Sequence, residues 1–273
     1  VNELCENLIL RGDIRSALAG IYDIARILGR ICLKTVIPGE LLTLKNSIAC
    51  LPELKYQLSK TKTQLLSEIG KNLDLMQDIY TLIDDSICED LSKGIIKPGK
   101  NSELDKLRMA RDEGHSWIVN AEAEEKEQTG IKNLKIRYNK VFGYYIEVGN
   151  LYKDKVPDYY IRKQTLVNCE RYITPKLKEM ENIILGSAEK IEAIESQLFE
   201  NVRESIELET ERIRTVCNYA AVTDVIASLA EVASKYNFTM PEISTGGEIE
   251  IKDGRHPVVE KTLSNTMFVP NDT

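Results

Sequence analysis

Residues 160–172 combine cationic side chains with neutral hydrogen-bonding ones, in the run Tyr-Ile-Arg-Lys-Gln-Thr-Leu-Val-Asn-Cys-Glu-Arg-Tyr. Arginine and lysine neutralise phosphate charge, whereas Gln, Thr and Asn side chains donate hydrogen bonds to phosphate oxygens without reading a base sequence. A second cationic group, Lys135, Arg137 and Lys140, precedes this run. These residue types indicate an interface for the backbone of DNA or of RNA. The alternative is an exposed charged tip that only keeps the protein soluble.

The charge of the chain is segregated along the sequence. The net charge over 273 residues is −7, which by itself argues against a nucleic-acid partner. Residues 131–179, however, hold eleven Lys and Arg against five Asp and Glu, a charge of +6, and the remainder carries −13. A basic segment in an acidic chain is expected where one part of a protein faces phosphate and the rest does not.

The sequence contains none of the common catalytic motifs. It has no Gly-x-x-x-x-Gly-Lys-Ser/Thr phosphate loop, no Gly-x-Gly-x-x-Gly, no His-Glu-x-x-His and no Gly-x-Ser-x-Gly. Two histidines and six cysteines without a Cys-x-x-Cys pair give no zinc spacing. We therefore predict no catalytic residue, no metal site and no enzymatic activity. The acidic run at 122–127 is interpreted as a solvated helix face.

The spacing of apolar residues around the basic segment changes from helical to strand-like and back to helical. Residues 102–130 read as one long helix that ends at Gly130, and Thr174 with Pro175 begins another that extends to about residue 235, with a possible bend at Gly186. Leu177, Ile184, Ile191 and Leu198 recur every seven residues, as in a helix–helix seam. Between these helices the pattern is that of strands, at 134–138, 141–148, 159–165 and 171–173, with a hairpin near residues 139–140. We therefore predict a mainly α fold, a long antiparallel pair of helices with a small antiparallel β-rich insertion at its tip.

The flanking regions are predicted to be helical on the N-terminal side and β-like at the C-terminal end. Apolar residues recur at helical spacing over 13–33, a second helix follows Pro38 and is interrupted or restarted at Pro52, and a third covers 73–87. Residues 93–100 read as a loop. Residues 248–251 alternate like a strand, 254–257 turn, and 258–259 resume the strand. Short apolar runs and the absence of an N-terminal targeting pattern favour a cytoplasmic protein without a membrane span.

Several motifs together resemble the MutS family of bacterial mismatch-recognition proteins. The motifs are residues 22–30 (Tyr-Asp-Ile-Ala-Arg-Ile-Leu-Gly-Arg), 138–148, 160–174, 224–232 and 254–260 (Gly-Arg-His-Pro-Val-Val-Glu). They occur in the family's order and cover essentially the whole chain. The resemblance favours double-stranded DNA as the ligand and bacterial cytoplasm as the location.

The resemblance also implies a division into parts and a set of contacts. Residues 1–130 and 174–240 correspond to core and lever helices, 131–173 to the DNA-gripping clamp, and 241–273 to the start of an ATPase domain. The expected DNA contacts are Arg162, Lys163, Gln164, Thr165, Asn168 and Arg171, with Lys135, Arg137, Asn139 and Lys140 second. Phe268 corresponds to an aromatic residue that stacks on adenine, without a phosphate site beside it. We expect no cofactor here; the family implies ATP and Mg²⁺, a second MutS subunit and MutL for the full-length protein. The competing hypotheses are a helical scaffold that binds another protein through its heptad seam, and an unrecognised ATPase.

Overall fold

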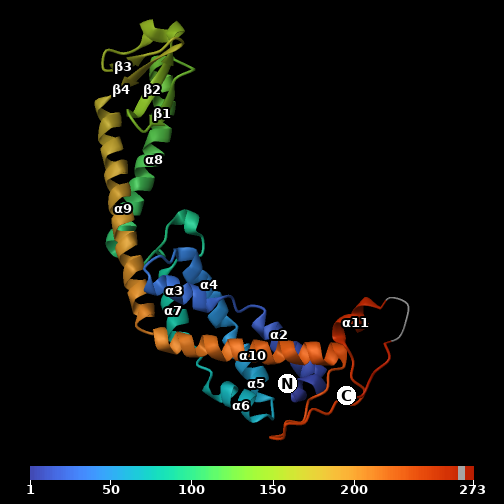
Figure 1. Ribbon diagram of the computed structural model, residues 1–273. Helices are drawn as coiled ribbons and strands as arrows, with labels where there is room; N and C mark the ends of the chain where they lie inside the picture. The colour runs from blue at the N-terminus through green and yellow to red at the C-terminus, as the bar shows by residue number, and fades with distance from the viewer. Residues whose placement is uncertain (264–267) are drawn as a thin grey trace.

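The computed structural model describes residues 1–263 and 268–273, and it shows a bent, elongated molecule with three parts (Figure 1). A helical body holds the N-terminus, a two-helix arm projects from it, and a small β-sheet head lies at the far end of the arm; the segment after residue 236 extends from the body to the C-terminus. We define the head as residues 131–173. The predicted fold class, mainly helical with an inserted antiparallel sheet, is confirmed.

The body is built from short helices whose buried faces form one apolar core. They are α1 (Asn2–Glu6), α2 (Leu8–Leu18), α3 (Ile24–Cys32), α4 (Pro38–Ala49), α5 (Leu51–Ser59), α6 (Gln64–Asn72) and α7 (Gln77–Ser86). Pro38 and Pro52 lie in the first turns of α4 and α5, as predicted. The single helix predicted over 13–33 is wrong, because the Asp23 side chain accepts a hydrogen bond from the Arg26 backbone and starts a new helix there. The helix predicted over 73–87 begins only at Gln77, after Met76 adopts a left-handed conformation with φ 46°.

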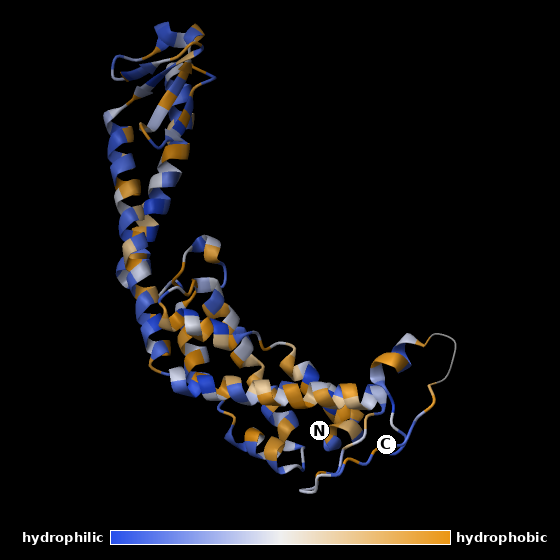
Figure 2. Ribbon diagram, in the orientation of Figure 1, coloured by the Kyte–Doolittle hydropathy of each residue, from blue (hydrophilic) through white to orange (hydrophobic). Residues whose placement is uncertain are grey.

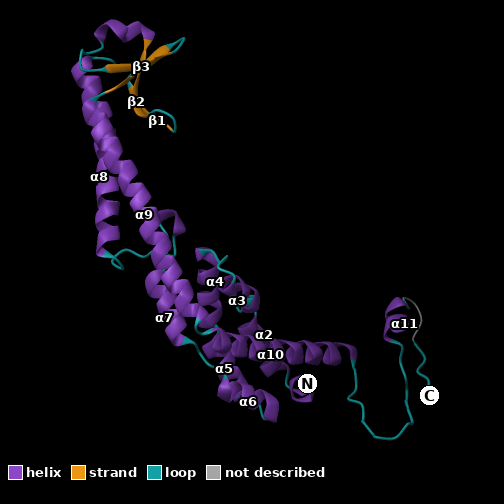
Figure 3. Ribbon diagram, turned by 60° about the vertical axis from the view of Figure 1, so that its left-hand side comes forward, coloured by secondary structure: helices purple, strands orange, loops and turns teal. Residues whose placement is uncertain are grey.

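The arm consists of α8 (Ser102–Thr129) and the first part of α9 (Pro175–Glu207), which run side by side (Figure 3). The Asn101 side chain caps the start of α8 by accepting from the backbone of residues 103 and 104, and Gly130 ends the helix with φ 66°. The predicted heptad residues Leu177, Ile184 and Ile191 are buried in the seam. Gly114 brings the helices close, since a Cβ there would lie 2.6 Å from Cγ1 of Ile184.

The head is a four-stranded antiparallel sheet in the order β1-β2-β4-β3. Its elements are β1 (Lys135–Asn139), β2 (Gly143–Gly149), the 3-10 helix η2 (Asn150–Lys155), β3 (Ile161–Thr165) and β4 (Cys169–Ile173). The predicted hairpin at residues 139–140 is confirmed. A second apolar cluster, separate from that of the body, joins the sheet to the arm through Ile146, Tyr172 and Leu177. The head and upper arm are otherwise largely hydrophilic (Figure 2).

The helix predicted to run from 174 to about 235 is two helices, and the predicted bend at Gly186 is wrong. Helix α9 passes through Gly186 and ends at Glu207, and α10 (Thr210–Tyr236) leaves in a new direction across α1, α2 and α3 (Figure 1). We call residues 203–212 the elbow. Helix α10 is long and apolar enough to cross a bilayer, with a mean hydropathy of 1.3 in its most apolar window, but here its buried side chains pack into the body core.

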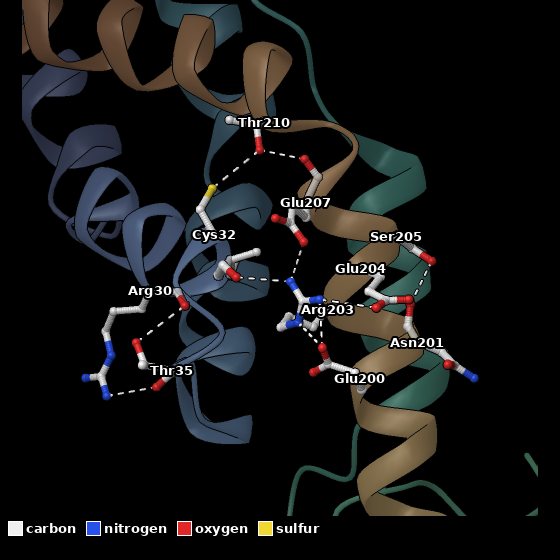
Figure 4. Close-up of polar contacts among 11 residues, drawn as sticks. Arg30, Cys32, Thr35, Glu200, Asn201, Arg203, Glu204, Ser205, Glu207 and Thr210 are labelled. Atoms are coloured by element: carbon white, nitrogen blue, oxygen red, sulfur yellow. Dashed lines mark hydrogen bonds and ion pairs between the residues drawn. The ribbon is translucent and has the colours of Figure 1, made fainter.

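A buried arginine holds the elbow (Figure 4). Arg203 is 1% exposed, and its guanidinium donates to the carbonyl of Ile31 at 3.1 Å and to carboxylates of Glu200 and Glu207. These hydrogen bonds raise the pKa of Arg203, so that it stays charged although it is shielded from solvent. One cation thereby joins the last turn of α3 to the end of α9, next to the start of α10.

The C-terminal segment differs from its prediction. Residues 258–259 lie in a short helix, α11 (Pro257–Thr262), because Pro257 occupies its first turn and the His256 ring accepts from the Val259 backbone at 3.3 Å. Within the described residues, 248–251 do not form a strand; Ile251 pairs with Thr273, and Gly254 with Asn271, through backbone hydrogen bonds.

Candidate nucleic-acid interface

The residues predicted as first contacts lie in the head, at the end of the molecule farthest from the body (Figure 1). Residues 162–165 belong to β3, Asn168 to the turn after it, and Arg171 to β4. β3 is an edge strand, so one row of its backbone N–H and C=O groups has no sheet partner. Cationic side chains and free backbone donors therefore occur on the same strand.

The strand pairing sorts the predicted residues onto two faces of the sheet. Directly paired residues share a face. Lys135 pairs with Glu147, Glu147 with Arg171, and Arg171 with Gln164. We call the face that bears this row the open face, because none of the four belongs to the apolar cluster of the head. The core face carries Ile146, Val148 and Tyr172.

Arg171 is tied into the open face. Its guanidinium lies 4.5 Å from the centroid of the Tyr145 ring and donates to Oε1 of Gln164 at 2.9 Å. Its side chain is 20% exposed, and its Nε lies 3.8 Å from Oε2 of Glu147. Arg171 and Gln164 thus hold strands β2, β3 and β4 in register, and Arg171 also presents positive charge.

Arg162 projects from the core face, near the edge of the sheet. It pairs with Tyr172 across the strands, and its guanidinium is 3.7 Å from Glu170, but 64% of its side chain is exposed. The Tyr172 hydroxyl also donates to Glu170, and burial together with this hydrogen bond raises the pKa of Tyr172 to about 12. Glu170 is therefore shared, and the Arg162 guanidinium stays largely accessible.

Lys163 lies between these two arginines at an irregularity of β3. Arg162 opposes residue 172 and Gln164 opposes residue 171, so that Lys163 is the extra residue of a β-bulge. Its side chain is exposed. Seven cations of the basic segment have no ion-pair partner among the described residues: Lys132, Lys135, Lys140, Lys153, Lys155, Lys163 and Lys176. Most of the positive charge of the head is therefore available to a ligand.

Comparison with known proteins assigns the head to a family. The family model of MutS family domain IV matches residues 99–190, that is α8, the whole head and the first half of α9. The DNA mismatch repair protein MutS of Acetivibrio thermocellus is 46% identical over 278 residues, which cover all of this chain and 32% of that protein. Those of Clostridium tetani and Lachnoclostridium phytofermentans are 49% and 47% identical, again over the whole chain.

The chain belongs to the MutS family. It spans just under a third of the length of the relatives that it matches. All ten predicted DNA contacts fall inside the region that matches MutS domain IV.

The second group of predicted contacts is spread along the MutS head. Asn139 ends β1 and Lys140 begins the β1–β2 turn, at the end of β2 opposite to the Asn168 turn. The Asn139 side chain accepts from the Val141 backbone at 2.8 Å and so stabilises this turn. At the other end of β2, Asn150 binds the carbonyls of residues 167 and 168. Lys135 and Arg137 lie on the open face between the two ends, and Arg137 is 3.6 Å from Glu147.

Three carboxylates of the arm helices hold the head, and sequence reasoning missed them. Glu122 accepts from the Ile136 backbone at 2.9 Å, Glu181 from the Tyr144 backbone at 2.8 Å, and Glu125 from two tyrosine hydroxyls at 2.9 Å each. The interpretation of residues 122–127 as a solvated face is therefore wrong for Glu122 and Glu125. A usable signal was present, because both share a helix face with the buried residues 118 and 121.

Close packing at Gly143 completes this attachment. Gly143 has φ 75°, and a Cβ at that position would lie within 2.5 Å of three carboxylate atoms of Glu181. Only glycine therefore lets the β1–β2 hairpin approach α9. For Glu122, burial raises the pKa, but hydrogen bonds from Lys126 and from the Ile136 backbone outweigh it and lower the pKa overall.

The expected nucleotide-stacking residue lies far from this interface. Phe268 is half-buried in the C-terminal segment, whose backbone pairs with residues 251 and 254 near the end of α10. Arg255 donates to the carbonyls of Tyr236 and Asn237 at 3.0 and 2.6 Å and so caps α10.

Proposed function

We propose that the head binds the phosphate backbone of double-stranded DNA without reading its sequence. The observation that carries this proposal is the gathering of unpaired lysines and partly exposed arginines at one end of a chain that is acidic elsewhere. Membership of the MutS family, whose curated relatives are named as DNA mismatch repair proteins, supports DNA over RNA. The contacts would position the head on DNA and leave mismatch reading to other parts of the protein.

The predicted contacts divide by their surroundings. Arg162, Lys163, Thr165 and Asn168 are exposed, and we propose that they reach phosphate first. Arg171 and Gln164 are half-buried; Arg171 would add charge, and Gln164 holds it in place while both keep the strands in register. Lys135 and Arg137 extend the same surface along the open face.

The full-length protein would use this head within mismatch repair. In that proposal, residues 131–173 act as the clamp, the helices of 1–130 and 174–240 as core and lever, and 241–273 as the beginning of an ATPase domain. ATP with Mg²⁺, a second MutS subunit and MutL would be partners of the whole protein. The residues present here hold no phosphate-loop motif, so we expect no ATP hydrolysis by this chain alone.

The scaffold hypothesis loses its main support from the packing of the arm. Of the four heptad residues that were to bind another protein, Leu177 and Ile184 are buried against α8 and the head, at 1% and 3% exposure, and Ile191 and the partly buried Leu198 pack into the body core. The seam is already occupied by the chain itself. A partner protein would need a different surface.

Fluorescence anisotropy with a labelled duplex tests the DNA proposal. At about 50 mM salt we expect a Kd in the range of about 10⁻⁴–10⁻⁶ M that is independent of base sequence and weakens steeply at about 200 mM. The double variant R162E/K163E should bind at least about tenfold more weakly, because it reverses two charges at the edge strand. A matched variant on exposed body lysines, K60E/K71E, should bind like the parent. Equal binding by parent and R162E/K163E would refute the assignment of the interface.

A further inference from the structure

Glu147 is an acidic side chain in the centre of the cationic open face. It lies directly opposite Lys135 on one neighbouring strand and Arg171 on the other. Its two carboxylate oxygens face different arginines, with Oε1 3.6 Å from Nε of Arg137 and Oε2 3.8 Å from Nε of Arg171. One carboxylate thus pairs with two arginines and lies across the strands from a third cation, Lys135.

These ion pairs are loose. A charge-assisted N–H···O hydrogen bond is about 2.7–2.9 Å long, whereas both pairs of Glu147 exceed 3.5 Å. The Nε of Arg171 is shielded from solvent and has no hydrogen-bond partner. The cluster therefore retains hydrogen-bonding capacity that the carboxylate does not use.

A phosphate diester is an anion that fits the unused hydrogen-bond donors of this cluster. It offers two unesterified oxygens with a shared negative charge, and guanidinium groups bind such an anion through parallel N–H···O bonds. The Arg137 side chain is 52% exposed, so a backbone phosphate can reach the cluster from solvent. Tyr145 and Gln164 keep the Arg171 guanidinium in place for it.

We propose that Glu147 is an internal competitor for DNA phosphate on the open face of the head. In the free protein its carboxylate balances Arg137 and Arg171; on binding, a phosphate takes over these two guanidiniums and Glu147 is displaced toward Lys135 or solvent. The proposal rests on DNA backbone binding by the head and adds a residue that sets its strength. Glu147 would keep the affinity low and the complex rapidly reversible.

The substitution E147Q tests the proposal, because glutamine keeps the size of the side chain and one acceptor oxygen and removes its charge. We expect E147Q to bind a duplex about 3–10-fold more tightly than the parent at about 50 mM salt, since one repulsive charge near the bound phosphate is lost. The matched control is D154N, which removes one charge from an exposed position of η2 in the same head. Without an arginine pair to release, it should change Kd by less than about twofold.

The outcomes separate this proposal from the one on which it rests. A parent protein that does not bind the duplex refutes the proposed function. A parent that binds, with E147Q no tighter than D154N, overturns the role of Glu147 and leaves the proposed function intact. Circular dichroism of each variant shows whether the head is folded.

A measurement on the parent alone keeps the test independent of folding. The arginine Nε–H resonances of Arg137 and Arg171 should shift when the duplex is added, whereas that of the buried elbow residue Arg203 should not. Unchanged Arg137 and Arg171 resonances in a protein that binds the duplex would contradict the exchange of Glu147 for phosphate.

Discussion

Glu125 receives hydrogen bonds from two neighbouring tyrosines and so joins the arm to the loop before β3. Burial and then the hydrogen bond to Glu125 raise the pKa of Tyr159 to about 12, and the same causes raise the pKa of Tyr160. A phenol whose pKa is raised in the folded state stabilises the fold below pH 10, its ordinary pKa, and loses that contribution as the pH rises toward 12. The attachment of the head is therefore sensitive to alkali.

Ultraviolet titration of the tyrosines tests the hydrogen bonds that Glu125 accepts from Tyr159 and Tyr160. In the parent we expect late phenols that ionise near pH 12. In E125Q the phenols of Tyr159 and Tyr160 should ionise closer to pH 10, whereas that of Tyr172, which donates to Glu170, should not move. The shift will be partial, because burial is the larger cause and persists in the variant. The matched control is E124Q, at an exposed neighbouring position, which should titrate like the parent. Identical late titrations of the parent and E125Q would contradict the contact.

At the scale of elements, the sequence predicts the ends of the arm helices next to the head. It does not predict that the interface residues divide between two faces of the sheet. Gly130, Thr174 and Pro175 have strong local preferences, and they delimit the head where the sequence predicts. A regular strand would place Arg162 and Gln164 on one face. The bulge at Lys163 shifts the register by one residue and puts them on opposite faces, and nothing local in the sequence marks it.

The elbow was missed for a related reason. No glycine or proline stands between Glu207 and Thr210, and both helices continue an apolar stripe, so the pattern shows no interruption. The turn depends on long-range contacts, namely the hydrogen bond from Arg203 to the Ile31 carbonyl and the packing of α10 against α1, α2 and α3. Long-range contacts of this kind leave no periodic signal.

Replacement of Arg203 tests the elbow. R203M fills a similar volume but leaves the Ile31 carbonyl without its donor and the nearby glutamates without a counter-charge. We expect the free energy of unfolding, measured with urea, to fall by about 1–3 kcal/mol. The comparison is R214M, which removes an exposed pair with Glu211 on α10 and should cost less than about 1 kcal/mol. Equal effects of the two variants would show that the buried cluster does not stabilise the elbow.

At the scale of the whole molecule, the proposed DNA interface depends on the position of the positively charged segment. The sequence already shows a segment of +6 in a remainder of −13, and the fold carries that segment to the end of the arm, away from the body (Figure 1). Sequence therefore predicts the charge segregation and the arm. It does not predict the bend that sets the direction of the arm, nor the arm carboxylates that fix the head upon it.

The most direct test of DNA binding by the head is hydrogen exchange with and without a duplex at low salt. We expect slower exchange on DNA addition in residues 131–175, strongest at β3 and the turn that contains Asn168, and no change in α1 to α7. Protection confined to the body helices, or no protection anywhere at duplex concentrations above about 10⁻⁴ M, would contradict the account.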